Sequence, residues 1–266
     1  MGNSAIHSTA VIDSGAGLHE SVRVGPYAVI DTGVAVGSDC NIGPHVHLTG
    51  QTTLGRGNQI HAGAVIGGAP QDLKYDGVPT QLRIGDENIF REHVTIHRSN
   101  TPDEDTIIGS GNFFMAHSHV GHNSEVGDHN TFANGALIAG HVEIADHAFI
   151  AGNCLVHQFV RIGTLALMQG GAAISKDLPP YTIAHGDNGI CGLNTVGLRR
   201  AGHTSEQRQA LKGLYRKLFL DGKNITEVVE VALMESPDDQ AREMLEFIAA
   251  SKRGVCGHVG RKANDD

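Results

Sequence analysis

A large apolar residue recurs at every sixth position over most of this chain. The count is unbroken from Ile6 to Ile66, and a second unbroken run extends from Ile108 to Ile174. A period of six fits neither the turn of an α-helix nor the alternation of a flat strand. It is typical of hexapeptide coils that stack as a parallel β-helix, with three hexads in each coil. The pattern therefore predicts a mainly β chain of roughly ten coils, spaced about 4.8 Å apart.

The hexads are interrupted twice, at 69–83 and at 99–106. Asp72 occupies a core position in the first interruption and Pro102 in the second. Because the count in sixes resumes after both, we interpret them as loops that leave the prism. Loops on a rigid scaffold often carry binding residues. We expect such a role for the first loop, whereas simple decoration is the plainer interpretation of the acidic second loop.

The end of the hexads divides the chain into two predicted domains. A parallel β-helix is expected over 1–184, followed by a connecting segment and a C-terminal helical domain over 185–266. The Gly- and Asn-rich stretch 183–200 is expected to be irregular. Three helices are expected after it. One begins after Thr204 or Ser205 and ends at Leu220, one covers 224–234, and one begins at an N-cap formed by Ser236-Pro237-Asp238 and ends near Lys252.

Composition narrows the possible partners and the compartment. The formal net charge of −9 argues against a nucleic-acid partner, which needs a basic face. The four cysteines do not form a recognisable disulfide framework, so a reducing cytoplasm is the expected location. No apolar run is long enough to predict a membrane span.

The segment from His117 to Asn123 is the strongest candidate for chemistry. Residues 18 positions apart stack, which places His122 under Gly140 and Gly140 under Gln158. His141 and His157 follow on the next coils, so we expect the three imidazoles to form a diagonal cluster. Neutral imidazole suits general-base catalysis. A Gly140 N–H without a side chain beside it could stabilise an oxyanion.

A second column contains Gly152 and Gly170, which are also 18 positions apart. Two missing side chains in one column would leave a shallow trough along the helix axis, in which a linear alkyl chain could lie. The alternative is that both are ordinary corner glycines.

Several segments beyond the hexads carry a family resemblance. The chain resembles the acyl-[acyl-carrier-protein]–UDP-N-acetylglucosamine O-acyltransferases, which perform the first step of lipid A synthesis. The resemblance covers nearly the whole chain, and its most specific parts are the QDLKY loop and the GLN…GLRR segment. The matching segments are QDLKYDGVPT (71–80), VTIHR (94–98), HSHVGHNSEVG (117–127), AGHV (139–142), HQF (157–159), DLPPY (177–181) and GLNTVGLRRAG (192–202).

The resemblance implies a left-handed β-helix and a homotrimer with active sites between adjacent prisms. It also implies transfer of a 3-hydroxyacyl chain from acyl carrier protein to the glucosamine 3-hydroxyl of UDP-N-acetylglucosamine. His122 would be the general base and the Gly140 amide would stabilise the oxyanion. No metal or cofactor would be needed, since a thioester is already an activated acyl donor.

The resemblance assigns further residues to the substrates. Gly170 would set the acyl-chain length, and a glycine there favours a longer 3-hydroxyacyl chain. Asn194 and Arg200 would meet the nucleotide. The remaining substrate-binding residues would be Gln71, Asp72, Lys74, His119, His141, His157 and Gln158.

The chain departs from the family pattern at three positions. Asn123 follows the expected base where some members have Asp, so another group would have to orient or polarise the imidazole if that carboxylate normally does so. Val196 replaces an acidic residue and Ala201 replaces an arginine near the nucleotide end. The acceptor could therefore be a variant such as a 3-amino sugar.

Three other functions remain open at this point. In a zinc hydratase of the γ-carbonic-anhydrase type, His117, His119 and His122 would be the metal ligands. The N-acyltransferase of the same pathway would be expected to carry an extra N-terminal domain. A non-catalytic scaffold would not depend on His122.

Overall fold

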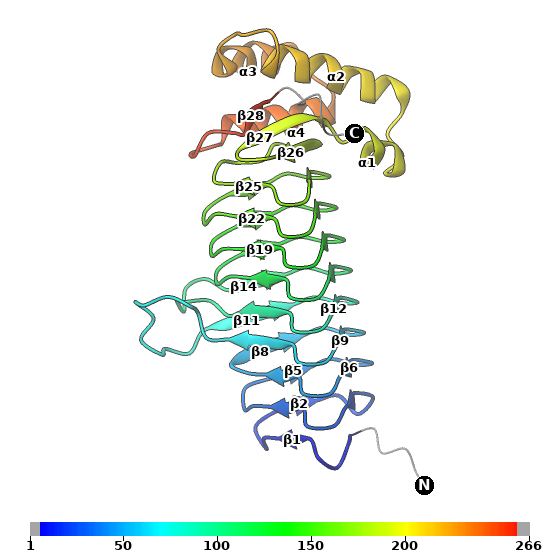
Figure 1. Cartoon of the computed structure of the whole chain (residues 1–266), viewed down its shortest axis with the longest axis vertical. Coiled ribbons are helices and arrows are strands. Elements are labelled where there is room, and N and C mark those ends of the chain that lie inside the picture. Colours follow the sequence, from blue (N-terminus) through cyan, green and yellow to red (C-terminus); the bar gives the residue numbers. More distant parts are fainter. Residues whose placement is uncertain (1–5, 260–266) are drawn as a thin grey trace.

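The structure, a computed structural model, describes residues 6–259. The outer ends of the two predicted domains, 1–5 and 260–266, lie outside the described residues. The strands wind into a three-faced prism, and the helices lie at its C-terminal end (Figure 1).

The described strands form three parallel stacks, one on each face, apart from one antiparallel pair at the C-terminal end. The nine-stranded sheet contains β1 (Val11–Ile12), β4 (Val29–Ile30), β7 (His47–Leu48), β10 (Val65–Gly68), β13 (Thr95–His97), β16 (His119–Val120), β19 (Leu137–Ile138), β22 (Leu155–Val156) and β25 (Ala173–Ile174). The eight-stranded sheet contains β2 (Gly17–Leu18), β5 (Ala35–Val36), β8 (Gln51–Leu54), β11 (Gln81–Ile84), β14 (Thr106–Ile108), β17 (Glu125–Val126), β20 (Glu143–Ile144) and β23 (Arg161–Ile162). The eleven-stranded sheet contains β3 (Arg23–Val24), β6 (Asn41–Ile42), β9 (Gln59–Ile60), β12 (Ile89–Phe90), β15 (Phe113–Phe114), β18 (Thr131–Phe132), β21 (Phe149–Ile150), β24 (Leu167–Met168), β26 (Thr182–His185), β27 (Gly189–Leu193) and β28 (Gly257–His258).

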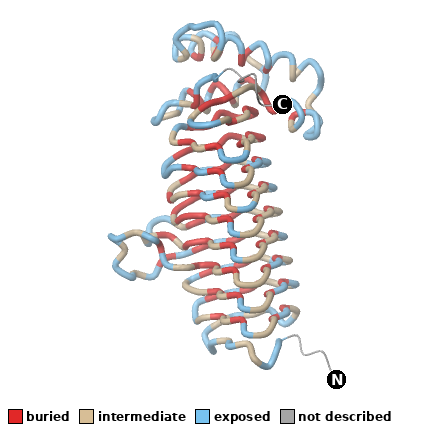
Figure 2. The backbone as a smooth tube through the Cα atoms, viewed as in Figure 1, coloured by how far each residue is buried: buried red, intermediate tan, exposed pale blue. Residues whose placement is uncertain are grey.

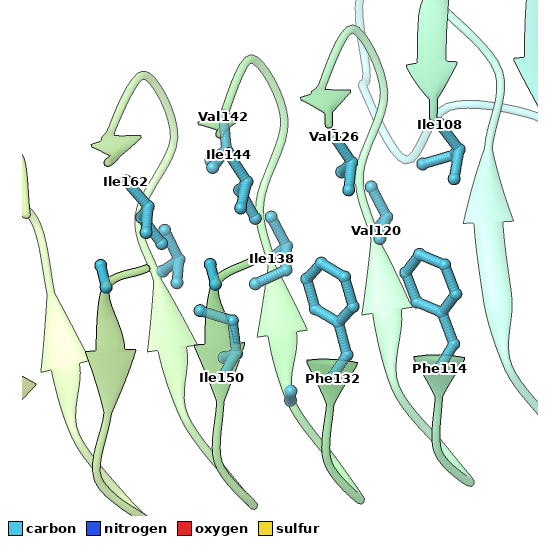
Figure 3. Packing of buried hydrophobic residues seen from close by; sticks show 14 of the residues in the cluster. Ile108, Phe114, Val120, Val126, Phe132, Ile138, Val142, Ile144, Ile150 and Ile162 are labelled. Atoms are coloured by element: carbon cyan, nitrogen blue, oxygen red, sulfur yellow. The ribbon is translucent and has the colours of Figure 1, made fainter. Parts of the chain in front are cut away.

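The hexad residues form the core of the prism. Most strands are two residues long, with the first side chain outward and the second buried, so buried segments line the inside of every coil (Figure 2). Along the axis each large side chain packs on its equivalent in the next coil, as Phe114 and Phe132 do in Figure 3. Their rings stack at 4.5 Å between centroids, and Phe90 stacks on Phe114 at 5.0 Å. Burial of one large apolar side chain per hexad is the main source of stability.

The register of the sheets accommodates both interruptions. Leu48 pairs with Ile66, 18 residues on, whereas Ile66 pairs with Ile96 and Ile96 with Val120. The second offset exceeds 18 residues by two hexads, and the third exceeds it by one hexad. The extra residues form a loop between β10 and β11, which projects from the prism in Figure 1, and a second loop between β13 and β14.

A column of buried asparagines replaces the small apolar residue in one corner. The side-chain Oδ1 of Asn58 accepts hydrogen bonds from the backbone and side-chain amides of Asn88, and Asn88 does the same for Asn112. Asn112 then accepts from the Asn130 N–H at 2.8 Å, and Asn130 from the Ala148 N–H at 2.6 Å. Each amide satisfies backbone groups that a hydrophobic residue would leave unpaired.

The C-terminal region closes the stack. β27 runs antiparallel to β26, and the helices lie over this end of the prism in Figure 1. They are α1 (Thr195–Arg200), α2 (Ser205–Phe219), α3 (Ile225–Met234) and α4 (Asp239–Ala249). No helix within residues 6–259 is both long enough and apolar enough to cross a membrane.

Three expectations about the helices need correction or refinement. Thr204 is the N-cap of α2 and forms a capping box with Gln207. Asp238, not Ser236, caps α4, because its carboxylate accepts from the Ala241 N–H, and the helix ends at Ala249 rather than near Lys252. The segment 183–200, interpreted as irregular, contains β27 and α1, since Asn194 provides an N-cap in a Gly-rich stretch.

Candidate active site

His122 lies at a coil corner directly after β16, and its neighbours fix its ring. Its Nδ1 is 2.8 Å from Oδ1 of Asn123. Asn123 is buried and adopts a left-handed backbone conformation with φ 57°, which asparagine tolerates better than most residues. The Asn123 N–H donates to Oγ1 of Thr106 at 2.7 Å, which secures the corner.

The hydrogen bonds of Asn123 determine which nitrogen of His122 carries a proton. The backbone N–H of Asn100, which can only donate, points at Oδ1 of Asn123 at 3.0 Å. On the other side, Ser99 donates its hydroxyl to the Thr101 carbonyl, so its oxygen accepts from Nδ2 of Asn123 at 2.8 Å. Oδ1 therefore faces His122, and the His122 proton must be on Nδ1. This leaves the lone pair of Nε2 available as a base.

Asn123 thus orients the imidazole itself. For orientation no further group is needed, because the amide oxygen of asparagine accepts the same hydrogen bond from Nδ1 that a carboxylate would accept.

Gly140 lies against the basic edge of His122, as the stacking of coils predicts. A Cβ on Gly140 would lie 2.8 Å from both Cε1 and Nε2 of His122, so only glycine fits without moving the ring. Within residues 6–259 the Gly140 N–H has no hydrogen-bond acceptor. A free N–H beside a free basic nitrogen is an arrangement suited to acyl transfer.

The two groups open into a cleft of about 760 Å³ along the nine-stranded sheet. Of the residues singled out from the sequence, the cleft wall contains Gln71, His119, His122, Gly140, His157 and Gln158. Its floor is mainly apolar and is formed by successive coils, with the outward side chains of Leu137 and Leu155 exposed on it. A polar end and an apolar floor suit a ligand that is itself amphipathic.

Asp72 and Lys74 lie beside this cleft in the first loop, and the second loop holds Asp72 in place. Oδ2 of Asp72 accepts from Nδ2 of Asn100 at 2.8 Å, and Oδ1 accepts from the Lys74 N–H at 2.9 Å. The hydrogen bond from the Lys74 N–H, followed by that from Asn100, lowers the pKa of Asp72. Asn100 therefore connects the first loop to the residue that orients His122.

His141 contacts His122 but faces a different hollow. The two rings meet edge to face with 5.1 Å between centroids, which agrees with the expected stacking. The other face of His141 stacks on Phe159 at 4.7 Å, and its Nδ1 is 3.8 Å from Oε2 of Glu104. Burial, followed by the proximity of His122, lowers the pKa of His141. Among residues 6–259, His157 lines the cleft without a ring contact to His122 or His141, and its Nδ1 is 3.5 Å from Nη2 of Arg253.

His97 lines the same cleft, although the sequence pattern did not identify it as a site residue. It is only 8% exposed, and its ring meets that of His119 edge to face at 4.7 Å. Burial, followed by the proximity of His119, His122 and Arg98, lowers the pKa of His97 to about 4. Burial also lowers the pKa of His119, whose Nδ1 is 2.8 Å from Oγ1 of Thr95. The available signal was its place in VTIHR, immediately before the second interruption.

The residues expected at the nucleotide end lie away from this cleft. The side chain of Asn194 caps α1 by accepting from the Gly197 N–H, and it donates to the Leu165 carbonyl. Arg200 and Val196 are exposed on α1, and Ala201 is its C-cap. The fold of this chain does not bring Asn194 and Arg200 to His122.

Gly152 and Gly170 stack as expected but lie outside the cleft wall. The Gly171 N–H donates to the Gly152 carbonyl at 2.9 Å, and a Cβ on Gly170 would meet only that carbonyl oxygen, at 3.6 Å. The surface over this column is therefore open.

The three histidines of the zinc alternative have separate surroundings. His117 stacks on His93 at a corner, His119 contacts Thr95, and His122 is held by Asn123. In the part of the chain that the structure describes, no three His, Cys, Asp or Glu side chains are placed to hold a metal ion.

Known proteins resemble the chain over nearly its whole length. A family model described as "Udp N-acetylglucosamine O-acyltransferase; Domain 2" matches residues 177–256, and one for bacterial transferase hexapeptides matches 105–140. The acyl-[acyl-carrier-protein]–UDP-N-acetylglucosamine O-acyltransferase of Thermodesulfovibrio yellowstonii is 40% identical over 94% of this chain and 98% of its own length. The enzyme of the same name from Syntrophobacter fumaroxidans is 43% identical with the same coverage.

Solved structures with a similar fold belong to enzymes of the same kind as the sequence relatives. UDP-N-acetylglucosamine O-acyltransferase from Moraxella catarrhalis superposes with a TM-score of 0.90 at 36% identity, over 95% of this chain and 100% of that one. The predicted fold class, a left-handed parallel β-helix followed by a C-terminal helical domain, is confirmed, and so is the prediction of an acyltransferase. With its stacked hexapeptide coils, its corner imidazole facing a glycine amide, and relatives at 40–43% identity, the chain belongs to the acyl-[acyl-carrier-protein]–UDP-N-acetylglucosamine O-acyltransferase family.

Proposed function

We propose that this protein transfers a 3-hydroxyacyl chain from acyl carrier protein to the 3-hydroxyl of UDP-N-acetylglucosamine, the first step of lipid A biosynthesis. One observation supports it most directly. His122 donates through Nδ1 and turns Nε2, the basic nitrogen of the neutral ring, toward the unpaired Gly140 N–H, in a cleft with an apolar floor. The names of two similar proteins, at 40% and 43% identity, supply the substrate classes.

The reaction follows from these two groups. Nε2 of His122 takes the proton of the sugar 3-hydroxyl as its oxygen attacks the thioester carbonyl carbon. The Gly140 N–H donates to the resulting oxyanion. When the tetrahedral intermediate collapses, the C–S bond breaks and the sulfur takes the proton from the imidazolium. The products are the O-acylated sugar nucleotide and the free thiol of the carrier protein.

The remaining expected residues are assigned to binding. We place the sugar near Asp72, Lys74 and Gln71, with His119, His141, His157 and Gln158 around it. Asn194 and Arg200 would reach the nucleotide from an adjacent protomer of a homotrimer, because they lie away from the cleft of their own protomer. Leu137 and Leu155 are 44% and 49% exposed at this cleft, which is consistent with a neighbour covering them.

We place the acyl chain along the open column of Gly152 and Gly170, with Gly170 as the residue that sets chain length. The absence of side chains over this column favours a longer 3-hydroxyacyl chain. We propose a cytoplasmic enzyme without cofactors.

A second acceptor deserves a separate assay. Asn123 gives the base a neutral partner, and an amine is a better nucleophile than a hydroxyl at the same position. The corresponding 3-amino sugar nucleotide is therefore the alternative substrate.

The test is an acyl-transfer assay with both acceptors and a panel of 3-hydroxyacyl carrier proteins. We expect His122→Ala to lower kcat/KM for the hydroxyl acceptor by roughly a hundred- to ten-thousand-fold, the usual cost of losing a general base. His19→Ala, an exposed histidine near the other end of the prism, is the matched control and should retain wild-type turnover. Near-wild-type activity of correctly folded His122→Ala would overturn the assignment.

A further inference from the structure

We infer that Glu104 is a positioning residue for His122, because its carboxylate reaches the base through the side-chain amide of Asn123. This inference rests on the function proposed above and concerns how that same base is stabilised. It assigns a role to the acidic second loop, which the sequence suggested was mere decoration.

The contact is direct on the Asn123 side. Oε2 of Glu104 accepts from Nδ2 of Asn123 at 3.0 Å, and Oδ1 of the same amide accepts from Nδ1 of His122 at 2.8 Å. Three side chains therefore form one hydrogen-bonded row, from carboxylate to amide to imidazole. The backbone N–H of Asn100 prevents the amide from flipping, since its donor needs Oδ1 where it is.

This hydrogen-bonded row would stabilise the positive charge that His122 acquires during the reaction. When Nε2 takes up a proton, His122 becomes an imidazolium whose Nδ1–H points at a neutral amide. A carboxylate bonded to the far side of that amide polarises it and makes Oδ1 a stronger acceptor, because hydrogen bonds in a row strengthen one another. Glu104 thus supplies negative charge one residue removed from the imidazole.

The second loop is built so that Glu104 reaches this position. Ser99 and Asn100, at its start, fix the Asn123 amide from two directions. At its end, Oγ1 of Thr106 accepts from the Asn123 N–H, and Asp105 pairs with Arg83 on β11. One short insertion therefore satisfies every polar group of Asn123 that faces it.

Other charged and titratable groups also surround the row. Asp72 is the second carboxylate that faces His122, from the first loop. Oε2 of Glu104 is 3.8 Å from Nδ1 of His141, so the carboxylate serves two imidazoles. The other groups facing His122 or sharing the hollow with Glu104 are His97, His119, Glu125, Glu143, Arg161, Asp177, Lys252 and Arg253.

The first test removes only the charge. In Glu104→Gln we expect kcat to fall roughly five-fold with little change in KM, the effect of one partly screened charge. The carboxylate favours the protonated imidazole, so its loss should also move the acidic limb of the pH–kcat/KM profile to lower pH. Asp103→Asn makes the same charge change one residue away, on an exposed side chain, and should leave kcat and the profile unchanged.

The second test places a carboxylate at position 123, directly beside the imidazole of His122. In Asn123→Asp the imidazole has its own carboxylate, so adding Glu104→Gln should cost nothing or even restore activity by removing repulsion between two carboxylates. The measured quantity is the coupling between the two substitutions in kcat. A purely structural role of Glu104 would give the same loss in both backgrounds.

The outcomes separate this inference from the proposed function. If His122→Ala retains activity, the proposed function fails. If His122→Ala is inactive while Glu104→Gln matches wild type in kcat and pH profile, or loses the same factor in both backgrounds, only the role of Glu104 is overturned.

Discussion

At the scale of single residues, the site depends on side chains that are absent as much as on those present. Gly140 allows the imidazole of His122 to lie against the backbone of the next coil, with Cε1 and Nε2 where a Cβ would otherwise be. Asn123 contributes by accepting a left-handed conformation and by offering an amide with one fixed orientation. Both features place Nε2 and the Gly140 N–H on one side of the cleft.

Gly140→Ala should therefore impair catalysis by moving the imidazole that we propose as the base. A methyl group 2.8 Å from two ring atoms forces the imidazole aside, and a displacement of about 1 Å can cost roughly a hundred-fold in rate. Steady-state kinetics should show this loss in kcat. The control is Gly17→Ala on β2, where a Cβ would meet nothing within 4 Å and activity should be unchanged. An active Gly140→Ala enzyme would mean that the ring does not work from this position.

At the scale of elements, polar stacks stabilise the coils alongside the apolar core. Inside the prism, hydrogen bonds join the asparagines of neighbouring coils into one column, formed by Asn58, Asn88, Asn112 and Asn130. Each amide has two coil neighbours, so the column acts on several coils at once.

Loss of one member should destabilise the fold. Asn112→Ala leaves the buried Asn130 N–H without its side-chain acceptor. It also removes the two hydrogen bonds that Nδ2 of Asn112 donates, to Oδ1 of Asn88 and to the Gly127 carbonyl. We expect a decrease of about 3 kcal/mol in the free energy of unfolding. Urea unfolding followed by circular dichroism measures it. Asn41→Ala, at an exposed outward position of β6, should unfold like wild type, and equal stability of the two variants would contradict the role of the column.

Much of this element structure was predictable from the sequence, and the rest was hidden for physical reasons. A period of six requires coils, and addition of 18 correctly brought Gly140 to His122. The asparagine column was not predictable, because an asparagine at a hexad position is indistinguishable from a surface residue until its bonding partner is known. The part played by Ser99 and Glu104 was also hidden, since their contacts lie across a coil boundary.

At the scale of the whole molecule, the cleft concentrates neutral histidines in a largely buried environment. His97 and His119 lie on neighbouring coils, and burial lowers the pKa of both. Their charged forms are therefore disfavoured in the folded chain, whereas the unfolded chain binds protons normally.

Stability should accordingly fall on acidification. With a folded pKa of about 4 for His97 against an unfolded value near 6.5, the contribution is complete above pH 6.5 and is lost as pH falls toward 4. At pH 5 this one residue should cost about 2 kcal/mol of unfolding free energy relative to pH 7. Denaturant unfolding at both pH values should show a smaller difference for His97→Asn than for wild type or His19→Ala. An identical pH difference in all three would contradict a buried, neutral His97.

The closed C-terminal end has a consequence for assembly. A ladder of parallel strands is a template on which another molecule could continue the pile, and amyloid fibres grow in this way. Here β27 reverses direction on β26, and helices lie over that terminus. A filament needs two adhesive tips on every unit, and residues 6–259 offer at most one, so stacking through that tip stops at a pair of molecules.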